Sequence, residues 1–309
     1  MINVIVSMTS KNTEQELKNT LNSIDTNDMS VLVVSSAGVN IHSDIFPQYS
    51  NIKHIFNTGR DDEHSTNFYH GIYNANENSN ILTFVKAGDI FCGRDVFPIV
   101  EQAFDNDVRL TTVRGRIRNK HNYNLYNSPV LNLQGWFFKK DFLDYYTFVK
   151  TFKHDVEFAL NLTYIAHLNK FSHMDINLDM VQVMNPVEYI GPSCVHYFNE
   201  ALPQQNFFNS HLGACFIFDI LCDCYITYVQ AANDGVSEDE MRLIMRDIQT
   251  FYDYFAKLEL DDLTILLSVY NLKMQKIYSA IGADSFTKKI PSISLVEFLN
   301  LHDREEVKE

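Results

Sequence analysis

The sequence is poor in basic residues. Its 309 residues include 25 lysines and arginines against 39 acidic residues, which gives a formal net charge of −14. A negative field of this size repels nucleic acids and anionic membranes at long range, so the charge argues against a protein that coats nucleic acid. It leaves room for a local basic groove that binds a phosphate.

Long apolar runs are also lacking. The most apolar stretch, residues 215–229, is interrupted by Asp219 and Asp223, and it is too short and too charged to span a bilayer. Residues 1–6 lack the positive segment and the long apolar core of a signal peptide. We therefore expect a soluble, cytoplasmic protein with no membrane-spanning segment.

Cysteine is scarce and odd in number. The five cysteines show no framework spacing, which indicates free thiols in a reducing compartment. Cys222 and Cys224 form a C-x-C in an apolar stretch, so small buried side chains are favoured over a zinc site. The sequence has no P-loop, H-E-x-x-H, G-x-S-x-G or C-x-x-C. These absences remove the commonest rival enzyme classes.

The sequence does contain an alternation of strand-like and helix-like segments. Apolar runs typical of buried strands occur at 4–8, 31–34, 52–56 and 81–85. Apolar stripes at helical spacing follow three of these runs: Leu17, Leu21 and Ile24; Phe68, Ile72 and Ala75; and Ile99, Val100, Ala103 and Phe104. The pattern predicts βαβ units and a mostly parallel sheet flanked by helices, with ligands bound at the carboxyl edge of the strands.

Local signals predict where helices begin and where the fold changes. Asn12 with Gln15 predicts a capping box for the first helix, and Asp95 predicts a cap for the third. From residue 207 the stripes are those of helices packed on helices. We therefore expect two regions, an α/β region at 1–206 and a helical appendage at 207–309.

Four segments of the first region resemble a known family. The first two are the strand and polar turn at 6–10 with the helix that follows, and the run at 33–38. The third, 81–91, follows a helix that begins with Asn67, and the fourth comprises 134–140 and 153–158. Together they resemble the family-two glycosyltransferases of the GT-A fold. The resemblance implies a Rossmann-like GT-A domain that binds a nucleotide sugar, with a UDP-sugar as the expected co-substrate.

The resemblance also shows where the chain departs from the family. The family carries an aspartate that contacts the uracil base after its second strand, and here Ser35 and Ser36 stand in its place. The metal-binding D-x-D becomes Lys86-Ala87-Gly88, with Asp89 next. A hard cation needs oxygen ligands, which lysine and glycine side chains lack. We therefore expect weak or no metal dependence, with Asp89 as the one remaining candidate ligand and Thr9, Ser10, Ser36, Lys86 and Asp89 as donor-binding residues.

Asp155 is the candidate general base. It matches the aspartate of the family's E-D-x-x-F motif, which takes the acceptor hydroxyl's proton in inverting members. The resemblance places the neighbouring His154 and the sole tryptophan, Trp136, on the acceptor side. Asp155 also has the position of an ordinary helix N-cap, and Trp136 that of a core residue, so both alternatives stay open.

The only dense basic run lies at 109–121. Arg114, Arg116 and Arg118 alternate, so on a strand they share one face and can bind diphosphate or an anionic acceptor. A charged edge strand that prevents aggregation gives the same pattern. Lys86 can contact phosphate as a point charge or be a solvated lysine after a strand.

Two histidines are weaker candidates. His196 lies where GT-A enzymes often supply a late metal ligand, but a structural role is favoured. His64, with Asp61, Asp62 and Glu63, can form a metal cluster, although adjacent acidic loop residues are more often solvated.

Two hypotheses follow. The first is an inverting hexosyl- or pentosyltransferase that acts on a glycan, or, as a second acceptor, on a hydroxymethylated base in viral DNA. The second is a catalytically inactive GT-A relative that serves as a binding or scaffold module, suggested by the joint loss of aspartate at Ser36, Lys86 and Gly88.

Overall fold

The computed structural model describes residues 1–25, 27–42, 44–59, 62–119, 124–125, 133–144 and 172–184. The strands are β1 (Ile2–Met8), β2 (Ser30–Ser35), β3 (Ile52–Phe56), β4 (Ile81–Lys86), β5 (Ile90–Phe91), β6 (Leu110–Asn119), β7 (Asn124–Leu125), β8 (Trp136–Lys139) and β9 (Ser172–Val183). The helices are α1 (Glu14–Asn22), α2 (His64–Asn74), α3 (Val96–Asn106), α4 (Lys140–Asp144) and a 3₁₀ turn at Phe46–Gln48. No helix within these ranges is long and apolar enough to cross a membrane.

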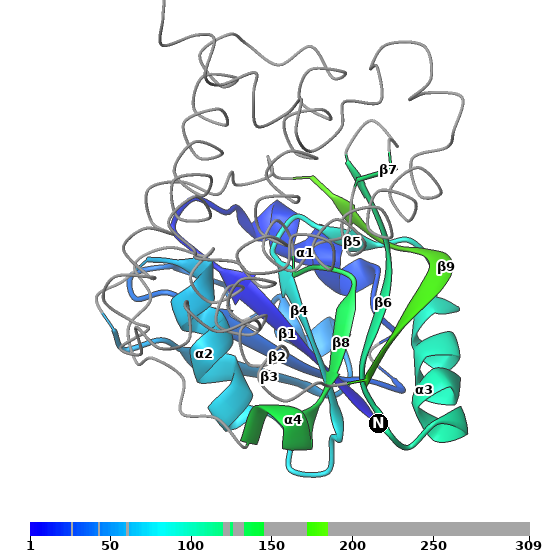
Figure 1. Cartoon of the computed structure of the whole chain (residues 1–309). Helices are drawn as coiled ribbons and strands as arrows, with labels where there is room; N and C mark the ends of the chain where they lie inside the picture. Colours follow the sequence, from blue (N-terminus) through cyan, green and yellow to red (C-terminus); the bar gives the residue numbers. More distant parts are fainter. Residues whose placement is uncertain are drawn as a thin grey trace, which may run out of the picture. The chain divides into compact units, whose positions relative to one another are not determined.

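A single mixed sheet organises these elements (Figure 1). Its strand order is β3-β2-β1-β4-β8-β6-β9-β5, with β7 paired to β6. The first four strands in this order are parallel, β8 is antiparallel to both β4 and β6, and β9 is parallel to β6. The predicted α/β class with a mostly parallel sheet is confirmed. The predicted boundary near residue 206 and the helical appendage at 207–309 lie outside the described residues.

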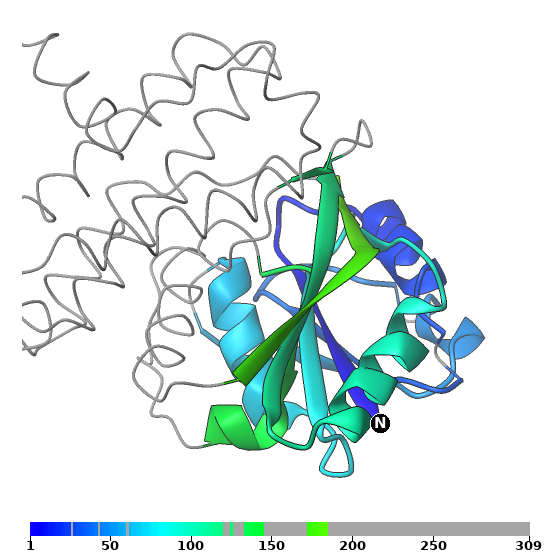
Figure 2. The same ribbon diagram turned by 45° about the vertical axis from the view of Figure 1, so that its right-hand side comes forward.

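The core has two layers, one on each face of the sheet. One contains alternate side chains of β1, β2 and β4 packed against α1 and α3, among them Val4, Val33 and Phe97. The other contains the remaining alternate side chains packed against α2 and α4, among them Ile5, Phe84 and Trp136. Figure 2 shows α2 and α4 on one side of the sheet and α1 and α3 on the other. The two-residue alternation of the strands accounts for this division.

The predicted stripes of the first three helices are buried except for Ile99, which is partly exposed, and two helix starts differ from the prediction. Thr13, not Asn12, is the N-cap of α1, and it forms a capping box with Glu16. A glutamate carboxylate accepts the backbone hydrogen bond more strongly than the amide of Gln15 does, which favours the later register. Asp95 occupies the N-cap position of α3, but its side chain makes no capping hydrogen bond.

Gly71 allows α2 to pack closely against β1. A Cβ at this position would lie 2.4 Å from Cγ2 of Ile5, and both residues are in the interior. We expect Gly71→Ala to lower the free energy of unfolding by about 1–3 kcal/mol, because overpacking exceeds the gain in helix propensity. Urea denaturation measures this, with Gly93→Ala as the control, since a Cβ there meets nothing within 4 Å. Equal stability of the two variants would contradict this packing.

Candidate functional site

The carboxyl ends of β1, β2 and β4 meet at one edge of the sheet. Strand β1 lies between the other two, so that Ser7 is level with Lys86 and Met8 with Ser35. The ladder continues past β2, where the Ser36 N–H donates to the Met8 carbonyl at 2.9 Å. The predicted donor residues in the loops after β1 and β2 and at the end of β4 are therefore neighbours.

A carboxylate from the loop after β3 joins this edge. Asp62 accepts a hydrogen bond from the Ser10 N–H at 2.9 Å and a short one from the Ser10 hydroxyl. The Ser36 hydroxyl also donates to it. Burial of Asp62 acts to raise its pKa, but these hydrogen bonds and the charge of Lys11 outweigh burial, and the pKa lies below the ordinary aspartate value. Asp62 therefore links the loops after three adjacent strands as an anion.

The lowered pKa of Asp62 gives a pH-dependent stability. A carboxylate whose pKa is lower in the folded state stabilises the fold above its unfolded pKa of about 4 and loses this contribution as the pH falls through the folded value. We expect wild type to be more stable than Asp62→Asn at pH 7, with a difference that shrinks as the pH falls below about 4. Urea denaturation across a pH series measures it, with the exposed Asp28→Asn as control. A difference that stays constant down to pH 2 would contradict the assignment.

Beneath these loops lies a buried hydrogen-bond network centred on Asn67. Its side-chain amide donates to the Ser7 hydroxyl, the Met8 carbonyl and the Ser36 hydroxyl at 3.0–3.2 Å. Its carbonyl oxygen accepts from Asn57 at 3.1 Å. The first residue of α2, His64, is also buried, and its Nδ1 lies 2.8 Å from the Ser7 hydroxyl. The network fixes α2 against β1 and β2 and holds Ser36 in place.

Thr9 belongs to the support of the site. It is buried, and its backbone N–H and hydroxyl both donate to the side chain of Asn12 at 3.0–3.1 Å. The Asn12 amide in turn donates to the Ala87 carbonyl at 3.1 Å. Asn12, expected to cap α1, instead joins the turn after β1 to the turn after β4.

Lys86 is the last residue of β4. By the alternation of the strand it belongs to the face that carries Leu82 and Phe84, beneath α2. The chain turns directly after it, where Gly88 has a φ of +106° that favours glycine. The Gly88 N–H donates to the Thr20 hydroxyl at 2.8 Å. The turn is thus fixed to α1, and Lys86 stands at the carboxyl edge with partial exposure.

The three alternating arginines lie on one face of β6, as predicted. Val113 and Ile117 of the same strand are buried in the opposite layer. Strand β6 lies inside the sheet between β8 and β9, so the interpretation as a charged edge strand is wrong. That interpretation depended on strand order, which local sequence does not fix.

Partners are present for each of these arginines. The Arg114 guanidinium lies 4.6 Å from the ring centre of Trp136, and Trp136 is itself 7% exposed in the layer beneath α2 and α4. Arg116 and Arg118 both form ion pairs with Asp179 of β9, at 2.8 Å for Arg116. Trp136 is therefore a core residue whose ring also supports a cation.

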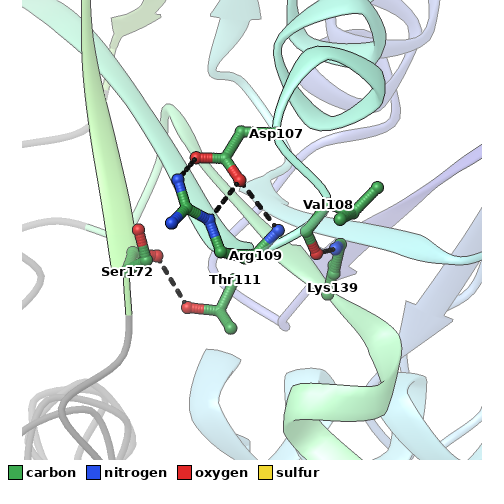
Figure 3. Close-up of polar contacts among 6 residues, drawn as sticks. All are labelled: Asp107, Val108, Arg109, Thr111, Lys139 and Ser172. Atoms are coloured by element: carbon green, nitrogen blue, oxygen red, sulfur yellow. Dashed lines mark hydrogen bonds and ion pairs between the residues drawn. The ribbon is translucent and has the colours of Figure 1, made fainter.

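Arg109 is separate from this stripe. Figure 3 shows it just before β6, where its guanidinium pairs with Asp107 at 3.0 Å in an exposed position. Nearby, the Thr111 hydroxyl donates to the Ser172 carbonyl at 2.8 Å, and Lys139 donates to the Val108 carbonyl. Arg109 lies at the amino end of β6, away from the carboxyl edge, and holds the entry to the strand.

Comparisons with known proteins bear on the fold. The sequence matches no protein-family model, and no curated protein matches it. Among solved structures, residues 1–349 of S. aureus TarS in complex with UDP-GlcNAc align with a TM-score of 0.56 at 13% identity, covering 82% of this chain and 81% of that one. The chain has the GT-A fold.

A second solved structure is less similar. Glucosyl-3-phosphoglycerate synthase from Mycobacterium tuberculosis, in complex with Mn²⁺, UDP and phosphoglyceric acid, aligns with a TM-score of 0.44 at 12% identity, over 60% of this chain and 71% of that one. At 13% identity the likeness to TarS establishes the GT-A fold alone.

The turn after β4, where the resemblance places the metal of GT-A enzymes, does not fit a divalent cation. Lys86 and Gly88 offer no side-chain ligand. Asp89, the remaining candidate, is fully buried, and its carboxylate accepts from the Gln134 amide at 3.2 Å and the Met184 N–H at 2.9 Å. Its expected role as a donor contact or metal ligand therefore needs correction: it anchors β9 and β8 to the turn. Within the described ranges no three His, Cys, Asp or Glu side chains are placed to hold an ion.

Several predicted residues lie outside the described residues. These are Asp155 and His154, His196, Asp61, and Lys120 and His121 at the end of the basic run. Their roles stay predictions.

Three residues of the edge, Asp62, Asn57 and Asn67, were not expected to contribute to the site. Asp62 and His64 were considered together as metal ligands, but they contact Ser10 and Ser7 respectively. The available signal was position: Asn57 follows β3 directly, and Asp62 shortly precedes the first residue of α2. Polar residues after a parallel strand belong at the carboxyl edge.

Proposed function

We propose that the chain is a glycosyltransferase that moves a sugar from a UDP-sugar to an acceptor hydroxyl at the carboxyl edge described above. The observation that carries the proposal is the convergence of Ser10, Ser36 and Asp62 beside Lys86 on the GT-A fold. TarS, the most similar structure described above, was solved with UDP-GlcNAc bound. Open α/β sheets bind nucleotides at this edge.

The polar loops supply the groups that a nucleoside requires. The Ser10 hydroxyl and the carboxylate of Asp62 can hydrogen-bond a base edge or the ribose hydroxyls, and the buried Ser36 hydroxyl supports Asp62 from below. The bonds that Asp62 makes with Ser10 and Ser36 hold these groups in place before a ligand arrives. A preorganised set of this kind lowers the entropy cost of binding.

Lys86 is proposed to stabilise the leaving group. As the sugar departs, negative charge develops on the diphosphate, and a cation aimed at it lowers the barrier. Lysine meets phosphate as a point charge. The β4 turn offers no metal ligands, so the reaction is proposed to have weak or no metal dependence.

Asp155 is proposed as the general base, which makes the reaction inverting. It would take the acceptor hydroxyl's proton while the hydroxyl oxygen attacks the anomeric carbon and the bond to the diphosphate breaks. The acceptor is proposed to be a glycan, and a hydroxymethylated base in DNA is the second acceptor considered. The protein is proposed to be cytoplasmic, with residues 207–309 as a helical appendage.

Thermal unfolding with a panel of nucleotide sugars tests the donor. At a concentration of 100 times Kd a ligand that binds only the folded state adds about 2.7 kcal/mol of stability, which raises the Tm by several degrees. We expect this rise with a UDP-sugar and with UDP, in EDTA as well as in Mn²⁺. No rise with any donor under either condition would contradict the proposal and favour an inactive scaffold.

A further inference from the structure

The arginine stripe of β6 is not used by the donor site. The stripe consists of Arg114, Arg116 and Arg118, and the last two share one carboxylate, that of Asp179 on β9. Arg116, Arg118 and Asp179 together carry an excess of one positive charge in a protein whose net charge is −14. Local charge of this sign in an acidic protein indicates a site for an anion.

The guanidiniums are partly exposed and incompletely satisfied. Side-chain exposure is 32% for Arg116 and 36% for Arg118, against 19% for the Asp179 carboxylate that they share. The Nε atom of Arg118 is buried and has no hydrogen-bond partner in the part of the chain that the structure describes. An orphaned buried donor points to a group that completes the site. Each guanidinium has five N–H donors, which is more than the oxygens of one shared carboxylate can accept.

The arginine stripe lies close to Lys86, the lysine proposed to contact the diphosphate of the UDP-sugar. Thr83 of β4 is level with Phe137 of β8, which is level with Val113 of β6. Lys86 and Arg116 both lie beyond that level toward the carboxyl ends of their strands, on the same face of the sheet, and β8 separates the two strands by two strand spacings. That separation is about 10 Å, roughly the size of one sugar ring with its substituents.

We propose, resting on the transferase function above, that the stripe binds an oxyanion of the acceptor, a phosphodiester or a carboxylate, and so selects anionic glycans. The guanidinium fork matches both groups with paired hydrogen bonds. The oxyanion sits between Arg116 and Arg118, in partial competition with Asp179. An acceptor hydroxyl about 10 Å away then reaches the anomeric carbon beside Lys86. A long nucleic acid is disfavoured because the protein is strongly acidic as a whole.

Trp136 provides the readout. It is the only tryptophan of the chain, and its ring lies 4.6 Å from the Arg114 guanidinium. An anion bound at Arg116, the next arginine of the stripe, reduces the positive field over the ring, so tryptophan emission is expected to report binding. The probes are dimethyl phosphate and acetate, titrated at constant ionic strength against chloride. We expect a saturable change with at least one of them, and the stronger probe identifies the acceptor's anion.

Two substitutions with opposite expected effects separate binding from folding. Arg118→Gln removes a charged hydrogen-bond donor and is expected to lower the affinity for the anion about tenfold. Asp179→Asn removes the competing carboxylate with little change of shape. It is expected to raise the affinity for the anion several-fold. Arg109→Gln is the matched control, because Arg109 pairs with Asp107 at the far end of the strand, and it should leave the titration unchanged. A merely structural role predicts lower stability for both variants and no increase in affinity for Asp179→Asn.

Calorimetry with UDP on the same proteins keeps the two proposals apart. Arg118→Gln is expected to bind UDP like wild type, and Lys86→Met to keep the response to the anion. If wild type does not bind UDP, the proposed donor site is wrong, and the anion titration still tests the arginine stripe independently. The oxyanion site would be overturned if chloride alone produced the same change in emission as the probes. Equal affinity for the anion in Arg118→Gln and Asp179→Asn would also overturn it. Tight oligonucleotide binding that weakens steeply with salt would overturn the glycan assignment.

Discussion

Replacing Lys86 by methionine is expected to lower kcat/KM for the UDP-sugar by about 10²–10³-fold, the loss typical of removing one group that stabilises developing charge. Methionine keeps most of the length of the side chain and removes only the charge. Lys86 ends β4 at the carboxyl edge, on a turn that is fixed to α1, so the substitution leaves the backbone of the site in place. The expected loss is therefore electrostatic.

Comparing the affinities for UDP and uridine shows whether Lys86 acts on the diphosphate or on the nucleoside. Lys86→Met is expected to lower the affinity for UDP strongly and the affinity for uridine hardly at all, because only UDP carries the diphosphate. Lys86→Arg keeps the charge and is expected to retain part of the activity. Lys53→Met is the control, since Lys53 is exposed near the amino end of β3, away from the carboxyl edge. Wild-type kinetics in Lys86→Met would show that Lys86 is a solvated lysine after a strand.

Replacing Asp155 by asparagine is expected to lower turnover by about 10²–10⁴-fold, the usual contribution of a general base. Asparagine cannot take the proton of the acceptor hydroxyl. It is, however, as good a helix N-cap as aspartate. The substitution therefore separates the two interpretations of Asp155, because a pure cap is preserved and a base is lost.

The matched variants for Asp155 are an alanine at the same position and Asp141→Asn on α4, where the carboxylate is exposed. If Asp155 is both base and cap, alanine lowers both turnover and stability, by about 1 kcal/mol for the cap. Steady-state kinetics with a fixed UDP-sugar and urea denaturation measure the two effects. Full turnover in Asp155→Asn would remove the proposed inverting mechanism.

The parallel half of the sheet could be predicted from the sequence because its signals are local. The buried runs of β1 to β4 and the helical stripes between them set both the elements and their order along the chain. The other half depends on distant pairings. Strand β8 inserts antiparallel between β4 and β6, and β9 pairs with β6 across irregular register shifts. No local pattern specifies such partners.

The candidate site divides in the same way. Ser10, Ser36 and Lys86 could be brought together in advance because each lies at or just beyond the end of a parallel strand. The burial of Asp89 could not, since it depends on Met184, 95 residues away, and on Gln134. The contact of Asp62 with Ser10 spans 52 residues and depends on how the loop after β3 folds back.

The central claim is that this edge binds a nucleotide diphosphate with a protein cation in the place of a metal. The most direct measurement is the calorimetric titration of UDP into the wild-type protein, first in EDTA and then in Mn²⁺. We expect binding in EDTA with an affinity within about threefold of that in Mn²⁺, which corresponds to less than 1 kcal/mol. Binding that vanishes in EDTA and returns with Mn²⁺ would contradict it.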